Sequence, residues 1–249
     1  MKFHHLIFFL ACSINSHSQI VNIENIRLAS KPEGLTGNVD LNINFTMNTV
    51  QLLNIGDRVR IGYRKNQHYI LLLTDHSFIK TNSISIVNLG FEHVRYTYTL
   101  KDSGNIAVEA FEQAQFNKIQ KINLRILLGG GFRFHLLDQK NYQLNLGTGF
   151  MFEYEELIDY GLSNDVLSNN YLSFDGQFND VVGLNTISYF QPKLIDFGNY
   201  RFANETQIRF KINKYLTYRI IYFLSHDSRD IDEVRKTNYT FKNALSFTF

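Results

Sequence analysis

The sequence predicts an all-β protein, a transmembrane antiparallel up-and-down β-barrel of about 12 strands, from three observations. Apolar and polar residues alternate with period two over long stretches. These stretches exceed the strands of soluble proteins, which cluster near about 5 to 6 residues, and suit tilted membrane strands, which need about 9 to 11 residues in hydrocarbon. The chain has 22 Phe, 14 Tyr and only 2 Pro, a mixture that favours strands.

The first residues, MKFHHLIFFLACSINSHSQ, predict a secretory signal peptide, residues 1–18. A lysine precedes a short apolar core, and small residues precede the cleavage site. The core is shorter than the roughly 20 residues of a spanning helix. Residues 19–35 are then a short periplasmic segment and residues 36–249 form the barrel. Cleavage removes Cys12, the only cysteine; the alternative is a lipoprotein in which Cys12 is the lipidated first residue.

Four segments show the alternation best. They are NVDLNINFT (38–46), KINLRILLGGGFRFH (121–135), NYQLNLGTGFMFEYE (141–155) and RFANETQIRFKI (201–212). Successive side chains of a strand point to opposite faces, so one face is apolar and suits lipid, and the other is polar. The three glycines at 129–131 lie within a strand and predict relief of crowding or a bend. From Leu89 to Glu92 the alternation is irregular, which indicates a bulge or a misplaced strand.

The connections between strands predict the orientation. The predicted strands span residues 36–47, 50–64, 67–79, 84–100, 104–116, 119–134, 140–155, 167–176, 180–191, 200–212, 215–226 and 237–249. Long connections follow the seventh, ninth and eleventh strands (EELIDYGLSND, QPKLIDFGN and HDSRDIDEVRK), and short ones follow the second, fourth, eighth and tenth. Outer-membrane barrels alternate short periplasmic turns with longer outside loops, so we expect both termini in the periplasm.

Several short motifs carry a resemblance to a known family. They are the Gly-x-x-Gly opening and Asn-Thr turn of GLTGNVDLNINFTMNT (34–49), the Tyr-rich HVRYTY, YFQP at 189–192 and the closing aromatic strand. With these motifs the chain resembles the salt-induced outer-membrane protein family over about residues 20–249, although Met47 stands where that family usually has glycine. The resemblance implies a barrel of about 12 strands in a Gram-negative outer membrane. It implies no catalytic residues.

If the apolar parity faces lipid, the charged residues of the other parity project into the lumen. They are Arg58, Arg60, Glu109, Arg125, Arg133, Glu153, Glu205, Arg209, Lys211 and Arg219. Two interpretations stay open. These charges pair with one another and plug the barrel, or the excess of Arg and Lys lines a narrow pore with a mild preference for anions. Barrels of about 8 strands are filled and those of about 16 to 18 leave a channel, so size does not decide.

The loop sequence SHDSRDIDE contains the residue types of Ser-His-Asp hydrolysis, with His226 and Ser228 as candidates, or of an oxygen-ligand cation site. No neighbouring strand offers a second half, so a solvated acidic loop is the favoured interpretation. We therefore predict no catalytic residue, metal or cofactor. The first function hypothesis is a non-enzymatic small channel or envelope-structural protein. The alternatives are an outer-membrane lipid hydrolase, and a surface adhesin or cation-binding protein that acts through outer loops.

The last strand carries a predicted assembly signal. Its apolar parity holds Tyr239, Phe241, Leu245, Phe247 and Phe249. A final strand with this alternation and a terminal aromatic residue resembles the signal read by the barrel-assembly machinery of Gram-negative envelopes. That machinery, outer-membrane lipids and lipopolysaccharide are the predicted partners, whereas a net charge of +2 does not point to nucleic acid. The last strand must also close against the first, because lipid cannot satisfy two open edges.

Overall fold

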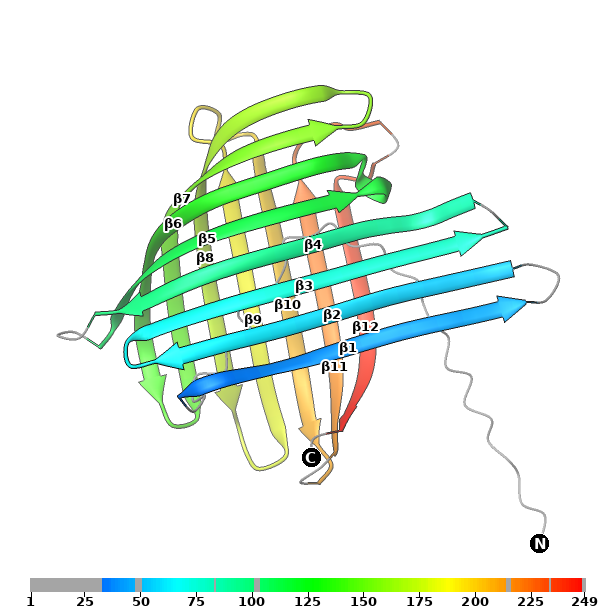
Figure 1. Ribbon diagram of the computed structural model, residues 1–249. Coiled ribbons are helices and arrows are strands. Elements are labelled where there is room, and N and C mark those ends of the chain that lie inside the picture. The colour runs from blue at the N-terminus through cyan, green and yellow to red at the C-terminus, as the bar shows by residue number, and fades with distance from the viewer. Residues whose placement is uncertain are drawn as a thin grey trace, which may run out of the picture.

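A computed structural model describes residues 33–47, 51–82, 84–100, 104–213, 216–232 and 234–247. It is all-β: one 12-stranded sheet in which each strand pairs with the next along the chain. Figure 1 shows this up-and-down sheet curling from β1, in blue, round to β12, in red. The predicted signal peptide and Cys12 lie outside the described residues. None of the described residues forms a helix that is long and apolar enough to cross a membrane.

The predicted strands are all present, in the predicted order. They are β1 (Gly34–Met47), β2 (Gln51–Lys65), β3 (His68–Thr81), β4 (Ile84–Thr99), β5 (Ile106–Asn117), β6 (Ile122–Gln139), β7 (Tyr142–Leu157), β8 (Gly161–Gln177), β9 (Val182–Pro192), β10 (Tyr200–Lys211), β11 (Leu216–Asp227) and β12 (Thr237–Phe247). A 3-10 turn, η2 (Lys118–Gln120), joins β5 to β6. All neighbouring pairs for which the register is described are antiparallel, as in the β6–β7 and β7–β8 ladders.

The prediction of a long connection after β7 is wrong. The ladder of β7 and β8 continues until Leu157 pairs with Gly161, so only a three-residue turn remains between them. Asp159 and Gly161 have φ angles of 70° and 81°, the left-handed conformation that tight turns require. The connections after β9 and β11 are longer, as predicted, and span residues 193–199 and 228–236. Two long connections support the alternation of loop lengths, while the periplasmic position of the termini stays a prediction.

The two faces of the sheet differ as the alternation predicts, although the concave face also holds apolar residues. Side chains of one parity are buried on the concave face, and large apolar side chains of the other parity are exposed on the convex face. In β4, however, Leu89 and Phe91 are buried and Glu92 faces outward. The pairing with β3 is continuous there, and its irregularity lies earlier, where Ile79 pairs with Val87. The disturbed alternation therefore marks apolar residues on the concave face, and the bulge predicted at this point is absent.

The concave face also has an apolar core. Tyr69, Leu71, Leu73 and Phe91 form one cluster, and Phe111, Leu127, Met151 and Leu167 form another. The polar parity that the sequence predicts for the interior thus contains buried apolar groups between the charges. One of them, Phe111, lies against a charged group, because the guanidinium carbon of Arg95 is 5.3 Å from the centre of the Phe111 ring.

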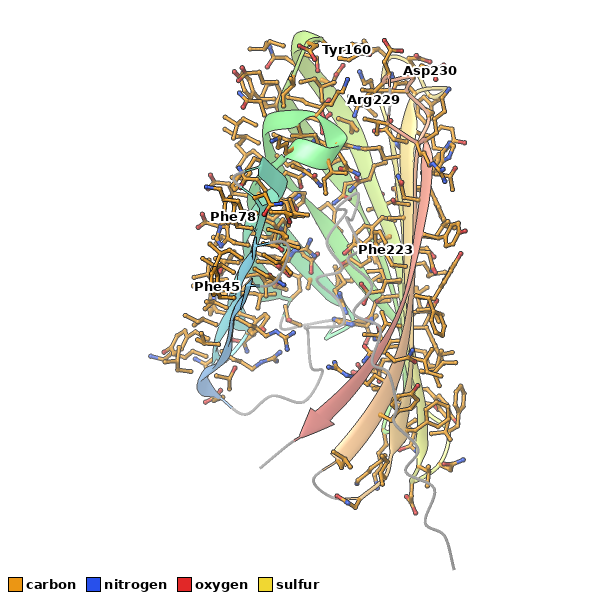
Figure 2. All side chains as sticks on the ribbon, turned by 90° about the vertical axis from the view of Figure 1, so that its right-hand side faces the viewer. Phe45, Phe78, Tyr160, Phe223, Arg229 and Asp230 are labelled. Carbon is orange, nitrogen blue, oxygen red and sulfur yellow. The ribbon has the colours of Figure 1, made fainter. Side chains whose placement is uncertain are left out.

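The predicted closure of the last strand on the first is not present. Within the described residues β1 and β12 pair only with β2 and β11, so the sheet has two edges. In Figure 2, Phe45 of β1 lies on one wall and Phe223 of β11 on the other. Pairing requires strands about 4.8 Å apart, and the curl of this sheet leaves the two edges on different walls. The observed architecture is therefore an open, strongly curled sheet.

Glycines on β6 and β7 make room for interior rings. A Cβ atom on Gly129 would lie 2.5 Å from Cζ of Phe111, closer than such atoms approach. A Cβ atom on Gly147 would overlap the ring of Tyr171, which crosses β7 from β8. The prediction that the glycine run relieves crowding is confirmed at Gly129.

We predict that Gly147→Val destabilises the fold by about 1 to 3 kcal/mol, the usual cost of overpacking, because the Tyr171 ring must move. The free energy of unfolding is measured by urea titration, with tyrosine fluorescence as the signal. Leu146→Val is the control, since Leu146 is 38% exposed on the convex face. Equal effects of the two substitutions would contradict the prediction.

Candidate functional site

The first candidate site is an ionic group around Glu109 on the concave face. Arg95 of β4 donates through Nη1 to Oε2 of Glu109 of β5, at 3.1 Å. The hydroxyl of Tyr171 donates to the same oxygen at 2.9 Å, and Nη1 of Arg133 of β6 donates to that hydroxyl at 3.2 Å. All four side chains are buried. We call them the Glu109 group; one carboxylate serves two guanidiniums, one directly and one through a tyrosine.

The Glu109 group depends on the glycine at position 147. Tyr171 is on β8 and Glu109 is on β5, so the ring must lie flat across β7 and β6 to reach the carboxylate. Gly147 leaves that path open because it has no side chain. The Arg133 guanidinium carbon lies 5.9 Å from the centre of the Tyr171 ring, a cation–π distance. The ring therefore connects the two ends of the group.

A second ionic group joins β6, β7 and β10 around Glu153. Nη2 of Arg201 lies 2.5 Å from Oε2 of Glu153, and Nε of Arg125 lies 3.5 Å from the same oxygen. The Glu153 side chain is only 1% exposed. A buried carboxylate is retained only when it is paired, and here a guanidinium approaches it from each side.

The same group continues to the β11–β12 loop through Glu155. Nε of Arg125 donates to Oε1 of Glu155 at 2.6 Å, and Arg229 of the loop donates to Oε2 of Glu155. Arg229 also donates through Nη2 to Oδ2 of Asp227 at 2.7 Å. We call Arg125, Glu153, Glu155, Arg201, Asp227 and Arg229 the Glu155 group. Its three guanidiniums face three carboxylates, so the group is electrically balanced.

The β11–β12 loop is held at this end of the sheet by three further contacts. The N–H of Asp232 donates to the hydroxyl of Tyr160 in the β7–β8 turn, at 2.7 Å. Ser228 accepts from the N–H of Tyr200 at 2.9 Å, and its own N–H donates to the Tyr200 carbonyl at 3.0 Å. Figure 2 shows Arg229 and Asp230 at the same end of the sheet as Tyr160. The loop thus connects β11 and β12 with β7, β8 and β10.

Arg229 stays charged in this setting. Burial by itself lowers the pKa of its guanidinium, but hydrogen bonds to Asp227 and Glu155 outweigh that effect and raise the pKa above its ordinary value. The attraction between the loop and the wall therefore persists at any pH at which the two carboxylates are ionised.

The residues predicted for the lumen fall into two sets. Glu109, Arg125, Arg133 and Glu153 are buried within the two ionic groups. Arg60, Glu205, Arg209 and Arg219 are half-buried, and Lys211 is exposed at the end of β10. Nη2 of Arg209 lies 3.0 Å from Oδ2 of Asp175 of β8. The side chain of Arg58 lies outside the described residues.

Sequence reasoning missed several members of these groups. Glu155 and Arg201 share the parity of Glu153 and Arg209 on their own strands, and that parity is a usable signal. Arg95 lies just after the irregular segment of β4, which concealed its direction. Arg229 is in a loop, where no periodicity exists, so only the three-dimensional structure could place it beside Glu155.

The loop residues proposed for hydrolysis do not form a catalytic arrangement with each other. Nδ1 of His226 lies 2.8 Å from Oγ1 of Thr237, whereas Oγ of Ser228 accepts from the backbone of Tyr200. In the described part of the chain no three His, Cys, Asp or Glu side chains are placed to hold a metal ion. Glu233 lies outside the described residues, so the loop supplies no assembled catalytic or cation site from its described part.

The predicted assembly residues lie on the convex face of β12 as far as they are described. Tyr239 is 73% exposed and Phe241 is 56% exposed. Leu245 and Phe247 belong to the strand, but their side chains and all of Phe249 lie outside the described residues. Their recognition by an assembly machinery stays a prediction.

Comparisons with known proteins match the chain to a family and to solved structures. A family model described as a protein of unknown function, DUF481, matches residues 58–249. The NanC porin structure has a TM-score of 0.50 at 10% identity, over 84% of this chain and 100% of that one. The CymD monoaromatic hydrocarbon channel has a TM-score of 0.46 at 8% identity, over 88% of this chain and 81% of that one. Among curated proteins no sequence matches. At this identity, the NanC likeness supports the fold alone.

We predict that Glu155→Gln lowers the free energy of unfolding by about 3 to 5 kcal/mol, because Arg125 and Arg229 then lose their shared carboxylate while buried. Urea titration of the folded protein measures the change. Asp230→Asn is a matched control in the same region, since Asp230 is 93% exposed and pairs with Lys236 at the surface, where an ion pair contributes little. A loss no greater than that of the control would contradict the prediction.

Proposed function

Because the chain belongs to the family described as a protein of unknown function, DUF481, its function has to be argued from its own geometry, and we propose a porin-like outer-membrane protein. In this proposal it is a non-enzymatic β-barrel of the bacterial outer membrane that serves as a small channel. If the interior is closed to ions, the proposed role is a structural one in the cell envelope. The antiparallel up-and-down sheet supports the proposal, and so does the fold likeness to the NanC porin.

One observation carries the proposal: burial is inverted with respect to a soluble protein. Leu128, Phe132 and Phe150 are 61%, 52% and 61% exposed on the convex face. Arg95 and Glu153 are 2% and 1% exposed on the concave face. A protein in water would bury the first set and expose the second. Lipid around the convex face removes this contradiction, because outer-membrane strands place apolar residues outside and polar residues inside.

The ionic groups favour a narrow channel over a wide one. The Glu155 group spans from β6 to the β11–β12 loop, and the loop lies at one end of the concave face, held by Arg229. Since its charges are balanced, this group by itself gives no preference for anions. Any preference must come from cations nearer the other end of the strands, such as Lys211 and Arg219.

Closure of the barrel, export and assembly belong to the same proposal. In lipid the unpaired edges of β1 and β12 would each expose a row of N–H and C=O groups, which is costly. We therefore propose that β12 pairs with β1 in the membrane, with both termini periplasmic. The signal peptide would direct export, and the barrel-assembly machinery would recognise β12. Outer-membrane lipids and lipopolysaccharide would surround the convex face.

Planar-bilayer recording tests the channel. We predict an ion current from purified protein whose folding is verified by heat-modifiable gel mobility. Arg229→Gln should increase the conductance, because it releases the β11–β12 loop from Glu155 and Asp227. Asp230→Asn should leave the conductance unchanged. Folded, heat-modifiable protein that carries no current would eliminate the channel and leave the structural role. Protein that remains soluble without detergent would eliminate the membrane protein altogether.

Paired cysteines test closure. We predict that Val39→Cys in β1 forms a disulfide with a cysteine at one of Tyr239, Phe241 or Asn243 in β12, when each pair is introduced in turn. Adjacent antiparallel strands bring one such pair to the Cβ separation of about 3.8 Å that a disulfide needs. In the control, Val94→Cys of β4 is combined with the same β12 cysteines in place of Val39→Cys. No disulfide in any of the Val39 pairs, in membrane-inserted protein, would show that the edges stay apart.

A further inference from the structure

A hydrogen-bonded patch of small polar side chains lies on the convex face of β7 to β10. Its members are Thr148 of β7, Ser168 and Asn170 of β8, Thr186 and Ser188 of β9, and Asn204 and Thr206 of β10. We call this the Asn patch. Each member alternates with buried neighbours of the concave face, such as Asn169, Ile187 and Ala203. The patch therefore faces outward, on the side that the proposed function assigns to lipid.

The β7–β8 half of the patch is centred on Asn170. Thr148 is directly opposite Asn170 in the ladder, and its hydroxyl donates to Oδ1 of Asn170 at 2.8 Å. Nδ2 of Asn170 donates to the Ser168 hydroxyl at 2.8 Å and lies 3.4 Å from the Phe190 carbonyl. Each of these side chains still has unused hydrogen-bonding capacity, because a hydroxyl has two lone pairs and an amide oxygen also has two.

The β9–β10 half is centred on Asn204. Nδ2 of Asn204 lies 3.0 Å from the Ser188 hydroxyl and 3.2 Å from the Thr186 hydroxyl. The Thr206 hydroxyl donates to Oδ1 of Asn204 at 3.1 Å. Thr206 and Thr186 are opposite each other in the ladder, with hydroxyls 2.8 Å apart. In the β8–β9 ladder Asn170 is opposite Phe190 and Ser188 is opposite Leu172. The two halves therefore meet diagonally at Asn170 and Ser188, and together they cross four strands.

Apolar side chains surround this surface along its strands. Leu146 and Phe150, on either side of Thr148 in β7, are 38% and 61% exposed. Val166 and Leu172, on either side of the β8 members, are each 47% exposed. The patch is therefore an island in the apolar belt and not part of a polar rim. Polar groups at this place lose their water in lipid, and burial without additional partners is unfavourable.

The chemistry of the patch identifies what would cover it. Every side chain in it is neutral and keeps free lone pairs, and a hydroxyl can turn its proton from an acceptor within the patch to an acceptor on another molecule. Two copies of the surface can therefore bond to each other. A two-fold dimer brings the same surface of two copies together, and Ser, Thr and Asn link membrane segments by hydrogen bonds in this way. The opposite wall is different: Asp57, Glu92 and Glu112 face outward on β2, β4 and β5, with His76 3.2 Å from Asp57. Two copies of that acidic wall would repel each other.

We propose that the Asn patch is a homodimer interface, covered in the membrane by the same patch of a second copy of this chain. The inference rests on the proposed function, because only a membrane makes the polar island costly. The partner is a second copy of this chain, and the interface is the wall that β7 to β10 form.

Single cysteines test the interface. They are placed in turn at Thr148, Ser188 and Thr206, in protein that lacks Cys12 through processing or through Cys12→Ser. Each variant is inserted in lipid vesicles and treated with a short bismaleimide. A dimer band is expected for at least one patch position and is expected to be absent for Val94→Cys, which is also outward-facing and 38% exposed.

The outcomes separate the interface from the proposed function. Heat-modifiable protein that stays monomeric at all three patch positions overturns the interface and leaves the membrane protein intact. Equal crosslinking at Val94→Cys overturns it too, because collisions then explain the bands. Protein that does not insert overturns both. Asn204→Leu combined with Thr206→Val should abolish the crosslink at Thr148→Cys and keep heat-modifiable mobility; an undiminished crosslink would also overturn the interface.

Discussion

The structure depends on the pairing of charges that the curled sheet places on its concave face. Arg125 and Arg229 both reach Glu155, and Arg125 and Arg201 both reach Glu153. Unpaired, any one of these buried ions would cost about 3 to 5 kcal/mol, a large part of the stability of a typical domain. Paired, they neutralise one another and fix the positions of β6, β7, β10 and the β11–β12 loop. This end of the interior therefore holds a connected ionic group, in which a change at one member alters the surroundings of the others.

Contacts elsewhere in the interior also depend on one another. Tyr171 reaches Glu109 only because Gly147 leaves its path open. The contact between β5 and β8 therefore requires a residue without a side chain at this position of β7. Phe111 packs in the same way over Gly129, and its ring lies 5.3 Å from the Arg95 guanidinium. The Glu109 group runs along neighbouring strands from β4 to β8, whereas the Glu155 group reaches from β6 and β7 to β10 and the β11–β12 loop. The two groups therefore pair the charges in different ways, one along the sheet and the other between strands that are not neighbours.

The sequence predicts what is periodic and local, and fails where the outcome depends on curvature. Period-two alternation is sufficient to predict each strand and to assign Glu109, Arg125, Arg133 and Glu153 to the polar face. It fails from Leu89 to Phe91, since an apolar residue on the concave face of β4 breaks the expected pattern as a bulge would. It cannot place Arg229 beside Glu155, because no periodicity exists in a loop. The sequence predicts too long a connection between β7 and β8, because Asp159, with its positive φ angle, lets the chain reverse within three residues.

The convex face carries information of a different kind. The side chains of the convex face point away from the interior, and the strands form as long as these side chains suit their surroundings. Polar residues on the convex face therefore take no part in the contacts of the interior. Asn170 and Asn204 nevertheless hold ordered hydrogen bonds there, between strands that the backbone already pairs. Leu or Val at these positions would suit lipid and would keep the pairing of the backbone. Their presence, together with the acidic residues of β2, β4 and β5, divides the convex face into walls of different chemistry. One wall is suited to meet a copy of itself and the other to avoid it.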